Sequence, residues 1–276
     1  MTGSQPAARE LIRRVVTYLA QDGVKETDVQ AVADALDVSP KLLLAIPVIR
    51  QLLQPAGLEA YLDWTVRDWL MYHYVFVHQG YRYGLPELQP TWRGRTLLKN
   101  PLDCWVYQEI VHRTRPDVLL ELGVAFGGSA LFFADLMELA GHGGVLGVDV
   151  SLDRARDVSH PRIEFLEGSS VEPVIVEEVR RRCHGKRVMV FADSNHAADH
   201  VLAELRAYAD LVGPGMYYIV EDTLADVLNL MPVPIEGPLA AVETFLAERT
   251  DFERDVRVAE RYVLSQSPYG FLRRVP

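Results

Sequence analysis

The stretch Val118-Leu119-Leu120-Glu121-Leu122-Gly123-Val124-Ala125-Phe126-Gly127-Gly128-Ser129 decides the fold of this chain. It begins with an apolar run that is typical of a buried strand, and its glycines then predict a tight turn. A helix is expected to follow over residues 129–140. A strand, a glycine-rich turn and a helix in this order indicate a nucleoside-binding α/β unit.

Further short apolar runs follow this unit, and helical patterns separate them. Strands are predicted at 145–150, 163–166, 187–192 and 216–220, with helices at about 172–183 and 197–211. This alternation predicts an α/β fold with a doubly wound, mostly parallel sheet of Rossmann-like type. A helix at 238–248 and two late strands, at 261–264 and 270–275, would add an antiparallel edge hairpin.

The N-terminal part of the chain has a different pattern. Residues 1–60 are helical in pattern, and we expect a helical appendage that serves oligomerisation. The main domain is predicted over 61–276, with a helical substrate-side segment at 61–115 and the sheet core at 116–276. The stretch 31–44 resembles a helix-turn-helix, but Lys41 is its lone basic residue, so DNA binding is not expected.

Composition excludes several partners. The chain of 276 residues has a net charge of -10, which opposes a polyphosphate backbone, so no nucleic-acid partner is expected. Apolar runs are shorter than the roughly 18 residues of a membrane span, and residues 1–6 show no signal-peptide pattern. We therefore expect a cytoplasmic protein without a membrane partner. Cys104 and Cys183 are isolated and predict reduced thiols.

Acidic residues stand at the ends of four predicted strands: Glu121, Asp149, Asp193 and the pair Glu221-Asp222. In an open α/β sheet, ligands bind beyond the carboxyl ends of the strands. A carboxylate at one strand end is common. Acidic residues at four strand ends along one edge predict a ligand site there.

The glycine turn favours a cofactor with a cationic end over a dinucleotide. Ala125 takes the middle position of the G-x-G-x-x-G pattern, where its methyl group hinders a pyrophosphate, and Glu121 adds negative charge. S-adenosylmethionine suits both features, because its amino acid end carries an ammonium and a sulfonium. We expect Glu121, Gly123, Gly127 and Ser129 to contact it.

Other cofactor contacts are predicted at the next strand ends. The Asp149 carboxylate can accept hydrogen bonds from both ribose hydroxyls of an adenosyl cofactor. Ser169 and Ser170 would border the adenine. Either serine can also serve as the N-cap of the helix that follows, and the two roles are compatible.

Asp193, Glu221 and Asp222 form the sharpest predicted site. Three carboxylates at neighbouring strand ends repel one another, and a bound dication removes that penalty. Hard oxygen ligands suit Mg²⁺, Ca²⁺ or Mn²⁺, whereas zinc favours softer ligands. Asp193 is a predicted cofactor contact as well. The alternative is that one or two of these acids cap the helices that follow.

A general base is predicted next to this site. His196 and His200 are four residues apart at the start of the helix after Asp193. His196 is the first candidate for the base, and a metal-bound carboxylate such as Asp193 is the other catalytic candidate. A surface or capping role is the alternative for both histidines.

From about Thr91 to the C-terminus, the chain resembles the cephalosporin hydroxylase / rhamnosyl O-methyltransferase family of class I methyltransferases. The motifs that carry this resemblance are Trp92-Arg93-Gly94, Lys99-Asn100-Pro101-Leu102-Asp103, Tyr107-Gln108-Glu109-Ile110, Glu121-Leu122-Gly123, Gly127-Gly128-Ser129, Gly147-Val148-Asp149, Glu167-Gly168-Ser169-Ser170, Asp193-Ser194-Asn195-His196, Val220-Glu221-Asp222-Thr223, Gly237-Pro238-Leu239-Ala240 and Ser267-Pro268-Tyr269-Gly270. The resemblance implies tailoring of natural products or their sugars, as in antibiotic biosynthesis. It also implies homo-oligomers and an acidic metal site at Asp193, Glu221 and Asp222.

Residues and resemblance together predict an S-adenosylmethionine-dependent O-methyltransferase that uses a divalent cation, with Mg²⁺ expected. The predicted acceptor is a hydroxyl of a small glycosylated or polycyclic natural product, such as a rhamnosyl unit or another vicinal diol, whose neighbouring oxygens can chelate the ion. Segments 72–83 and 224–238 are expected to shape the acceptor pocket.

Three alternatives remain open at this point. A metal-dependent oxygenase of a natural product such as a cephem would need an iron site, usually of two histidines and one carboxylate. A cofactor-sensing regulator could be built on the N-terminal helices, although the acidic charge opposes DNA binding. An NAD-linked dehydrogenase is disfavoured by Ala125 and Glu121.

Overall fold

The computed structural model describes residues 11, 14, 15, 17, 18, 29–38, 90–227, 236–259, 261, 262 and 264–275. The chain forms two compact units, Met1–Gln89 and Pro90–Pro276. In the described part of the first unit lies the helix α2 (Val29–Ala35). The predicted boundary near residue 60 and the aromatic segment 72–83 lie outside the described residues, so the predicted division into domains stays a prediction.

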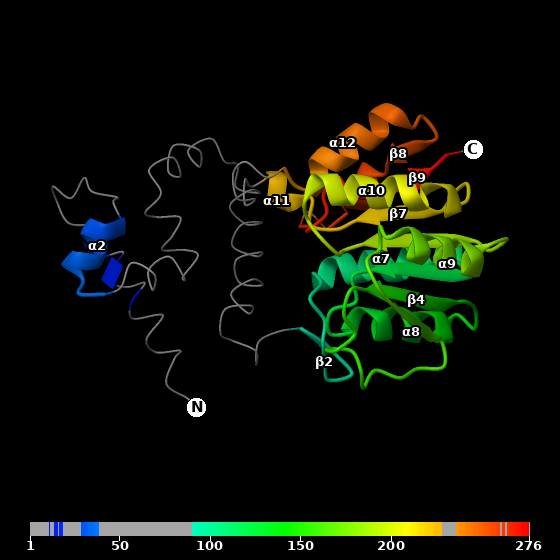
Figure 1. The fold of residues 1–276 in the computed structure, drawn as a ribbon, viewed down its shortest axis with the longest axis horizontal. Coiled ribbons are helices and arrows are strands. Elements are labelled where there is room, and N and C mark those ends of the chain that lie inside the picture. The colour runs from blue at the N-terminus through cyan, green and yellow to red at the C-terminus, as the bar shows by residue number, and fades with distance from the viewer. Residues whose placement is uncertain are drawn as a thin grey trace. The chain divides into compact units, whose positions relative to one another are not determined.

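The second unit is built on a seven-stranded sheet with the order β5-β4-β3-β6-β7-β9-β8 (Figure 1). Its central strands run parallel to one another. They are β3 (Val118–Leu122), β4 (Gly144–Asp149), β5 (Ile163–Glu167), β6 (Val188–Ala192) and β7 (Tyr217–Val220). The predicted Rossmann-like fold with a mostly parallel sheet is confirmed.

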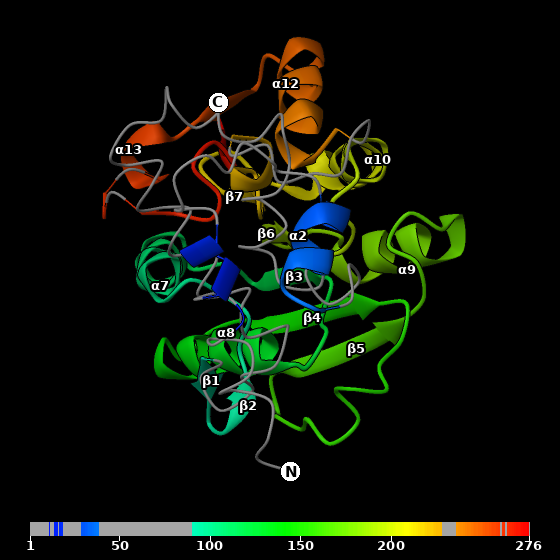
Figure 2. The same cartoon turned by 90° about the vertical axis from the view of Figure 1, so that its left-hand side faces the viewer.

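Helices cover both faces of this sheet. Figure 2 shows α7 (Pro101–Thr114) and α8 (Gly128–Leu139) on one side, with α9 (Pro173–Cys183) and α10 (Ala198–Tyr208) on the other. Another helix, α12 (Pro238–Glu248), packs on α10. Because both faces are covered, β3 and β6 are buried at every position, which explains why their sequences are apolar except for Glu121 in β3.

Shorter elements complete the described part of this unit. They are β1 (Thr91–Trp92), β2 (Arg95–Thr96), a 3₁₀ turn at Ala209–Leu211, α11 (Leu224–Val227) and α13 (Val256–Ala259). The strands β1 and β2 form a small antiparallel hairpin. Within the described residues, none of the helices combines the length and the apolar character that crossing a bilayer requires.

The antiparallel edge of the sheet differs from the prediction in one strand. β9 (Phe271–Arg274) pairs antiparallel with β7 and with β8 (Phe252–Arg254). The prediction of a strand at 261–264 is wrong, because residues 261 and 262 lie in a turn. The observed partner is β8, in which Phe252 is buried with its ring 5.3 Å from that of Phe245 on α12. A local β-forming pattern contains no such information.

An aromatic cluster joins α7, α8 and the centre of the sheet. The Tyr107 ring lies 4.9 Å from that of Phe191 and 6.0 Å from that of Phe133, and the two phenylalanine rings are 4.5 Å apart. All three side chains are fully buried. Edge-on and tilted contacts of this kind add to the free energy of burial. The cluster also fixes the direction of the Tyr107 hydroxyl, which points toward the site described next.

Candidate active site

Backbone hydrogen bonds align the strand ends that carry the predicted site. Gly123 N–H donates to the Val148 carbonyl at 2.8 Å, Asp193 N–H donates to the Leu122 carbonyl at 2.8 Å, and Glu221 N–H donates to the Ala192 carbonyl at 2.9 Å. The ladder of the parallel sheet thus continues one residue beyond β3, β6 and β7. The residues that follow these strands therefore lie side by side at one edge of the sheet.

The glycine turn approaches two other backbone segments closely. A Cβ atom at Gly123, where φ is +93°, would lie 2.1 Å from the Asp193 carbonyl oxygen. One at Gly128 would lie 2.1 Å from the Thr96 carbonyl oxygen. Only glycine permits both approaches. Gly127, with φ of +75°, precedes α8 without a side-chain cap, so the first N–H groups of α8 are available to an anionic group such as a carboxylate.

Asp149 holds the same turn from the end of β4. Its Oδ2 accepts hydrogen bonds from the N–H groups of Val124 at 2.8 Å and Ala125 at 2.9 Å, and Oδ1 accepts one from Ser151 N–H at 3.1 Å. Ala125 adopts a left-handed conformation with φ of +47°. Oδ1 keeps a lone pair that suits a ribose hydroxyl. The ribose contact of Asp149 stays a prediction.

Glu121 lies beneath the turn and is fully buried. Within the described residues, neither of its carboxylate oxygens makes a hydrogen bond of normal geometry. Burial raises the pKa of Glu121 to about 7, against the opposing effects of the Lys99 ammonium and the Ser129 hydroxyl. A buried carboxylate without a hydrogen bond favours a cation nearby. This environment supports the predicted contacts of Glu121 and Ser129 with a cationic cofactor.

Asp193 and Asp222 come together beyond β6 and β7, and His196 joins them. One ligand atom from each of these residues lies within 4.8 Å of the other two. His196 Nε2 is 2.8 Å from Asp222 Oδ2 and 3.5 Å from Asp193 Oδ1, yet it makes no hydrogen bond of normal geometry within the described residues. Asp222 adopts a left-handed conformation with φ of +57°, a strained backbone of the kind that gathers at functional sites.

The charges of this cluster depend on one another. Burial alone would lower the pKa of His196, but the carboxylates of Asp193 and Asp222 outweigh it and raise this pKa to about 10. The imidazole is therefore protonated at neutral pH in this arrangement. Burial acts to raise the pKa of Asp193, but Lys99 and His196 hold it well below its usual range.

Glu221 lies next to this cluster but is held in the interior. The Lys99 ammonium lies 3.0 Å from Glu221 Oε1 and 2.7 Å from Asp193 Oδ2. The Tyr107 hydroxyl donates to Glu221 Oε1 at 2.9 Å, and the Ser267 hydroxyl donates to Oε2 at 3.0 Å. Burial raises the pKa of Glu221 although Lys99 opposes the shift. His196 thus takes the third place in the cluster, and the metal role of Glu221 stays a prediction.

The predicted adenine-side serines differ in their surroundings. Ser170 is buried, and its hydroxyl donates to the carboxylate of Glu204, whereas Ser169 is half-buried. His200 Nε2 lies 3.2 Å from Ser170 Oγ and 3.3 Å from Glu204 Oε1. His200 therefore belongs to this second polar group and not to the cluster around Asp193.

Sequence reasoning missed several polar residues of this region: Lys99, Tyr107, Ser194, Glu204 and Ser267. Four of them, all but Glu204, stand in motifs that carry the family resemblance, which was the available signal. A lysine or a serine in a loop is usually exposed, so the sequence alone gives no reason to expect it in the interior.

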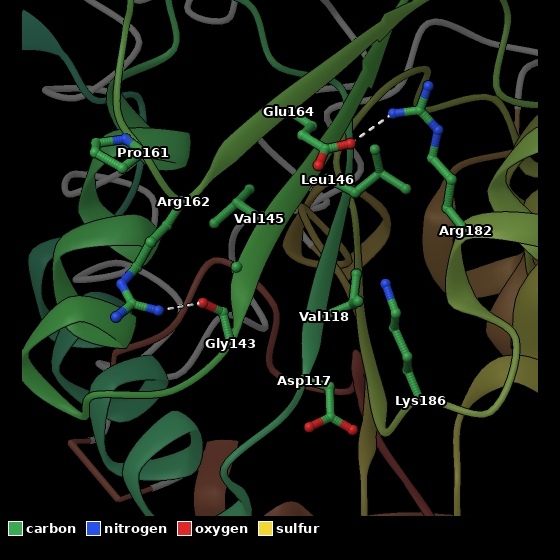
Figure 3. Close-up of a pocket in the computed structure, with 11 residues that line it drawn as sticks. Asp117, Val118, Gly143, Val145, Leu146, Pro161, Arg162, Glu164, Arg182 and Lys186 are labelled. Carbon is green, nitrogen blue, oxygen red and sulfur yellow. Dashed lines mark hydrogen bonds and ion pairs between the residues drawn. The ribbon is translucent and has the colours of Figure 1, made fainter.

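Two pockets lie within the described part of the second unit. One, of about 380 Å³, is largely apolar and shares Lys99 with the acidic region; its lining includes Trp92, Leu97, Trp105, Phe132 and Leu136. The other, of about 270 Å³, lies at the amino ends of β3, β4 and β5 (Figure 3). There Arg162 donates to the Gly143 carbonyl at 2.7 Å and Arg182 pairs with Glu164 at 2.7 Å. This second pocket lies at the sheet edge opposite the acidic cluster.

Comparison with known proteins identifies the family. Residues 87–275 match the family described as Rhamnosyl O-methyltransferase/CmcI. A Rhamnosyl O-methyltransferase of Mycobacterium leprae (strain TN) is 38% identical over 191 residues, which cover 67% of this chain and 82% of that protein. One of Mycobacterium tuberculosis (strain CDC 1551 / Oshkosh) is 35% identical over 205 residues, or 71% of this chain and 83% of that protein.

Solved structures agree with this assignment. An apo-structure of CmcI is 27% identical, with a TM-score of 0.54, and the match covers 68% of this chain and 76% of that one. A CmcI structure with Mg and S-adenosylmethionine is 27% identical, with a TM-score of 0.53 and coverage of 68% and 77%. The chain therefore belongs to the Rhamnosyl O-methyltransferase/CmcI family and is an S-adenosylmethionine-dependent O-methyltransferase.

Proposed function

We propose that this chain methylates a hydroxyl of a sugar or another vicinal diol on a small natural product, with a divalent cation, Mg²⁺ above all, at the acidic cluster. The observation that carries this proposal is the cluster of Asp193, His196 and Asp222 immediately beside the glycine turn. The relatives named Rhamnosyl O-methyltransferase support a sugar acceptor. A cytoplasmic location and a homo-oligomer remain predictions.

The donor set fits a divalent cation. Asp193 and Asp222 offer carboxylate oxygens, which Mg²⁺ and Mn²⁺ prefer. The buried Nε2 of His196 faces both without a hydrogen bond of normal geometry among the described residues. Glu221 is the further acidic ligand that the sequence predicts, one residue before Asp222. A cation bound there would compensate the carboxylates and polarise the acceptor hydroxyl.

The surroundings of the glycine turn fit S-adenosylmethionine. The first N–H groups of α8 after Gly127 suit its carboxylate. The buried carboxylate of Glu121, which has no hydrogen bond of normal geometry within the described residues, suits its cationic end. Asp149 has a free lone pair for a ribose hydroxyl. Ser169 is the first candidate for the adenine side, and Ser170, whose hydroxyl already donates to Glu204, stays a predicted contact.

Methyl transfer follows from this arrangement as an in-line displacement. The acceptor oxygen forms a bond to the methyl carbon while the carbon–sulfur bond breaks, and its electron pair stays on sulfur to give S-adenosylhomocysteine. A base takes the hydroxyl proton. His196 is the first candidate, once a bound cation compensates the carboxylates that keep its imidazole protonated, and an Asp193 oxygen is the second. Holding the two reactants in line can supply roughly 7–11 kcal/mol of the barrier reduction.

The apolar pocket beside Lys99 supports an acceptor with a hydrophobic scaffold. Its volume of about 380 Å³ lies in the usual range for sites of small organic ligands. Trp92 and Trp105 line it, and aromatic rings of this kind bind both sugars and polycyclic groups. Such an acceptor could place its apolar part in the pocket and its diol at the acidic cluster. The predicted contributions of segments 72–83 and 228–235 lie outside the described residues.

The oxygenase alternative is not favoured. A non-haem iron site of the usual kind needs two histidines and one carboxylate. Among the described residues, the cluster around Asp193 contains His196 as its one histidine, while His200 contacts Glu204 and Ser170. An assay under anaerobic conditions separates the two reactions, because a methyltransferase continues to work without oxygen.

The central experiment compares the wild-type chain with Asp193→Ala. S-adenosylmethionine is incubated anaerobically with rhamnosylated and catechol-type acceptors, with Mg²⁺ or with excess chelator, and S-adenosylhomocysteine is quantified. We expect turnover that requires Mg²⁺ in the wild-type protein and a loss of at least about 100-fold in the variant, while calorimetry still detects S-adenosylhomocysteine binding.

Two companion variants sharpen this experiment. His196→Gln should lower kcat by about 100-fold or more without weakening cofactor binding, as expected for loss of a general base. Asp210→Ala serves as the matched control, because this exposed aspartate pairs with Arg249 outside the site. Full activity of Asp193→Ala, or of the wild-type protein in excess chelator, would rule out the metal role.

A further inference from the structure

A second polar group adjoins the proposed site through Ser194, the residue after Asp193. The proposed function assigns no role to this group. Its centre is Glu204 on α10, a carboxylate that is fully buried. The hydroxyls of Ser170 and Ser194 both donate to the same oxygen, Glu204 Oε1, the latter at 2.6 Å. Ser170 follows β5 on the predicted adenine side, and Ser194 directly follows Asp193 on the metal side. One carboxylate oxygen therefore joins two loops, and a different ligand is predicted to bind to each of them.

The helix that carries Glu204 holds the adenine-side loop at more than one point. His200, Glu204 and Tyr208 are spaced four residues apart and so share one face of α10. The Tyr208 hydroxyl donates to the Ser170 carbonyl, and His200 Nε2 lies 3.2 Å from the Ser170 hydroxyl. Three side chains of one helix thus contact Ser170, which ties its position to that of α10.

The link to the metal-side loop is a single hydrogen bond. In the described residues, Ser194 reaches α10 through its hydroxyl on Glu204. The other oxygen, Glu204 Oε2, makes no hydrogen bond within the same residues. A buried carboxylate costs free energy that an apolar side chain of similar size does not. The hydrogen bonds that Glu204 accepts from the two loops offset part of this cost, and they depend on the positions of both loops.

We propose that Glu204 is a positioning residue that couples the two loops, so that cofactor binding and cation binding strengthen each other. This inference rests on the proposed function, because it assigns one ligand to each loop. A cofactor that fixes the loop after β5 would fix Ser170 and, through Glu204, the hydroxyl of Ser194. Asp193, the residue before Ser194, is then already held in the position in which it would bind the cation. Such coupling is reciprocal by thermodynamic necessity.

Calorimetry measures this coupling without any acceptor or turnover. S-adenosylhomocysteine is titrated into the full chain with and without saturating Mn²⁺, and Mn²⁺ is titrated with and without saturating S-adenosylhomocysteine. We expect each ligand to lower the Kd of the other by at least about 5-fold, the lower end for coupled sites. In Glu204→Gln and in Ser194→Ala this factor should fall below about 2-fold.

The variants separate coupling from stability. Ser194→Ala removes only one hydroxyl, so it provides a second test of the coupling should Glu204→Gln fail to fold. Thr114→Val is the matched control, since the Thr114 hydroxyl is also buried but donates to the Ile110 carbonyl in the last turn of α7; it should keep the full coupling factor. A factor in Ser194→Ala equal to that of the wild-type protein would overturn the inference.

The result for the wild-type protein also shows whether the coupling alone or the proposed function itself is wrong. Binding of both ligands with independent Kd values would overturn the role of Glu204 and leave the proposed function standing. Failure of the wild-type chain to bind S-adenosylhomocysteine or Mn²⁺ would overturn the proposed function, and the coupling with it.

Discussion

Lys99 is a charged residue in the interior of the protein, whereas lysine side chains usually lie in water. Only 3% of its side chain is exposed, and its ammonium contacts Asp193 and Glu221. Burial acts to lower its pKa, but the two carboxylates outweigh burial and raise the pKa well above its ordinary value. A buried charge of this kind is stable only while its partners are present. The stability of the site and its affinity for a cation are therefore linked through Lys99.

Replacing Lys99→Met should reveal this link. The carboxylates of Asp193 and Glu221 would lose their counter-charge, which costs about 3–5 kcal/mol when one partner of a buried pair is removed. Because an added dication can compensate the same carboxylates, Mg²⁺ should raise the Tm of the variant by more than that of the wild-type protein. Thermal unfolding with and without Mg²⁺ measures this difference.

Lys186→Met provides the control for this substitution. Lys186 is exposed and lines the pocket at the opposite edge of the sheet. Its loss should change neither the Tm nor the response to Mg²⁺ by a comparable amount. A response to Mg²⁺ that is the same in Lys99→Met as in the wild-type protein would contradict an ion next to Lys99.

At the scale of elements, the ends of β3 and β6 act as one unit. The two strands are in register from Val118 with Val188 to Leu122 with Ala192. Beyond the last pair, Asp193 N–H donates to the Leu122 carbonyl, and the Gly123 backbone fills the space beside Asp193. The pairing of β3 with β6 thus holds the glycine turn and Asp193 at a fixed distance from each other.

Gly123→Ala should break this unit. The added methyl would meet the backbone of Asp193, which cannot rotate away as a side chain could. A matched control is Gly141→Ala, where φ is also positive, at +65°, but open space surrounds the added atom. The control should lose about 1 kcal/mol for its backbone conformation, and Gly123→Ala about 1–3 kcal/mol more for overpacking. Urea unfolding measures both.

The same comparison has a functional readout. Gly123→Ala should also weaken binding of S-adenosylhomocysteine, since the turn and Asp193 can no longer approach each other. Gly141→Ala should bind it as the wild-type protein does. Equal losses of stability in the two variants would show that the close approach at Gly123 carries no cost of its own.

Elements with a mostly apolar sequence could be predicted from the chain alone. The runs at β3 and β6 are buried on both faces, so burial and sequence carry the same information there. The edge strand β8 could not be predicted, because it has three residues and of these only Phe252 is buried. Propensity is least informative where only one face of a strand is covered.

The candidate site could be predicted in part for a related reason. Parallel strands bring their carboxyl ends to one edge, so acidic residues such as Asp193 and Asp222 could be assigned to it from their positions. The direction of each side chain depends on partners far along the chain. Lys99 and Asp193 are 94 residues apart in sequence, and no local pattern indicates that Lys99 holds Glu221 in the interior.

At the scale of the whole molecule, buried acids make folding stability depend on pH. Asp103 on α7 is buried, and its Oδ2 accepts a hydrogen bond from Gln266 N–H at 2.8 Å. Burial raises its pKa to about 8, with a further contribution from Glu221. An unfolded aspartate has a pKa of about 3.9. Between these values the folded state keeps a proton that the unfolded state releases, so stability falls as pH rises.

Asp103→Asn should weaken this pH dependence. The asparagine keeps the size of the side chain and an oxygen for Gln266 N–H, but it has no proton to lose. The urea midpoint of the wild-type protein should fall between about pH 4 and pH 8, and that of the variant should fall less. An identical decline in both proteins would exclude Asp103 as a source of the effect.

Asp251 provides a control of opposite sign. The Arg249 guanidinium lowers its pKa to about 2, with a smaller opposing effect of burial. Its contribution to stability is therefore complete above about pH 4 and is lost as pH falls toward 2. Asp251→Asn should change the stability curve below about pH 4 and leave the decline between about pH 4 and pH 8 as in the wild-type protein.

The chain itself supplies part of the positive charge that its acidic cluster needs. Asp193, Glu221 and Asp222 bring three carboxylates to one sheet edge, and Lys99 contacts two of them. The imidazole of His196 lies 2.8 Å from the third, Asp222, and is protonated at neutral pH. A divalent ion that entered this cluster would be repelled by both side-chain cations, so its binding should release the His196 proton to the solvent.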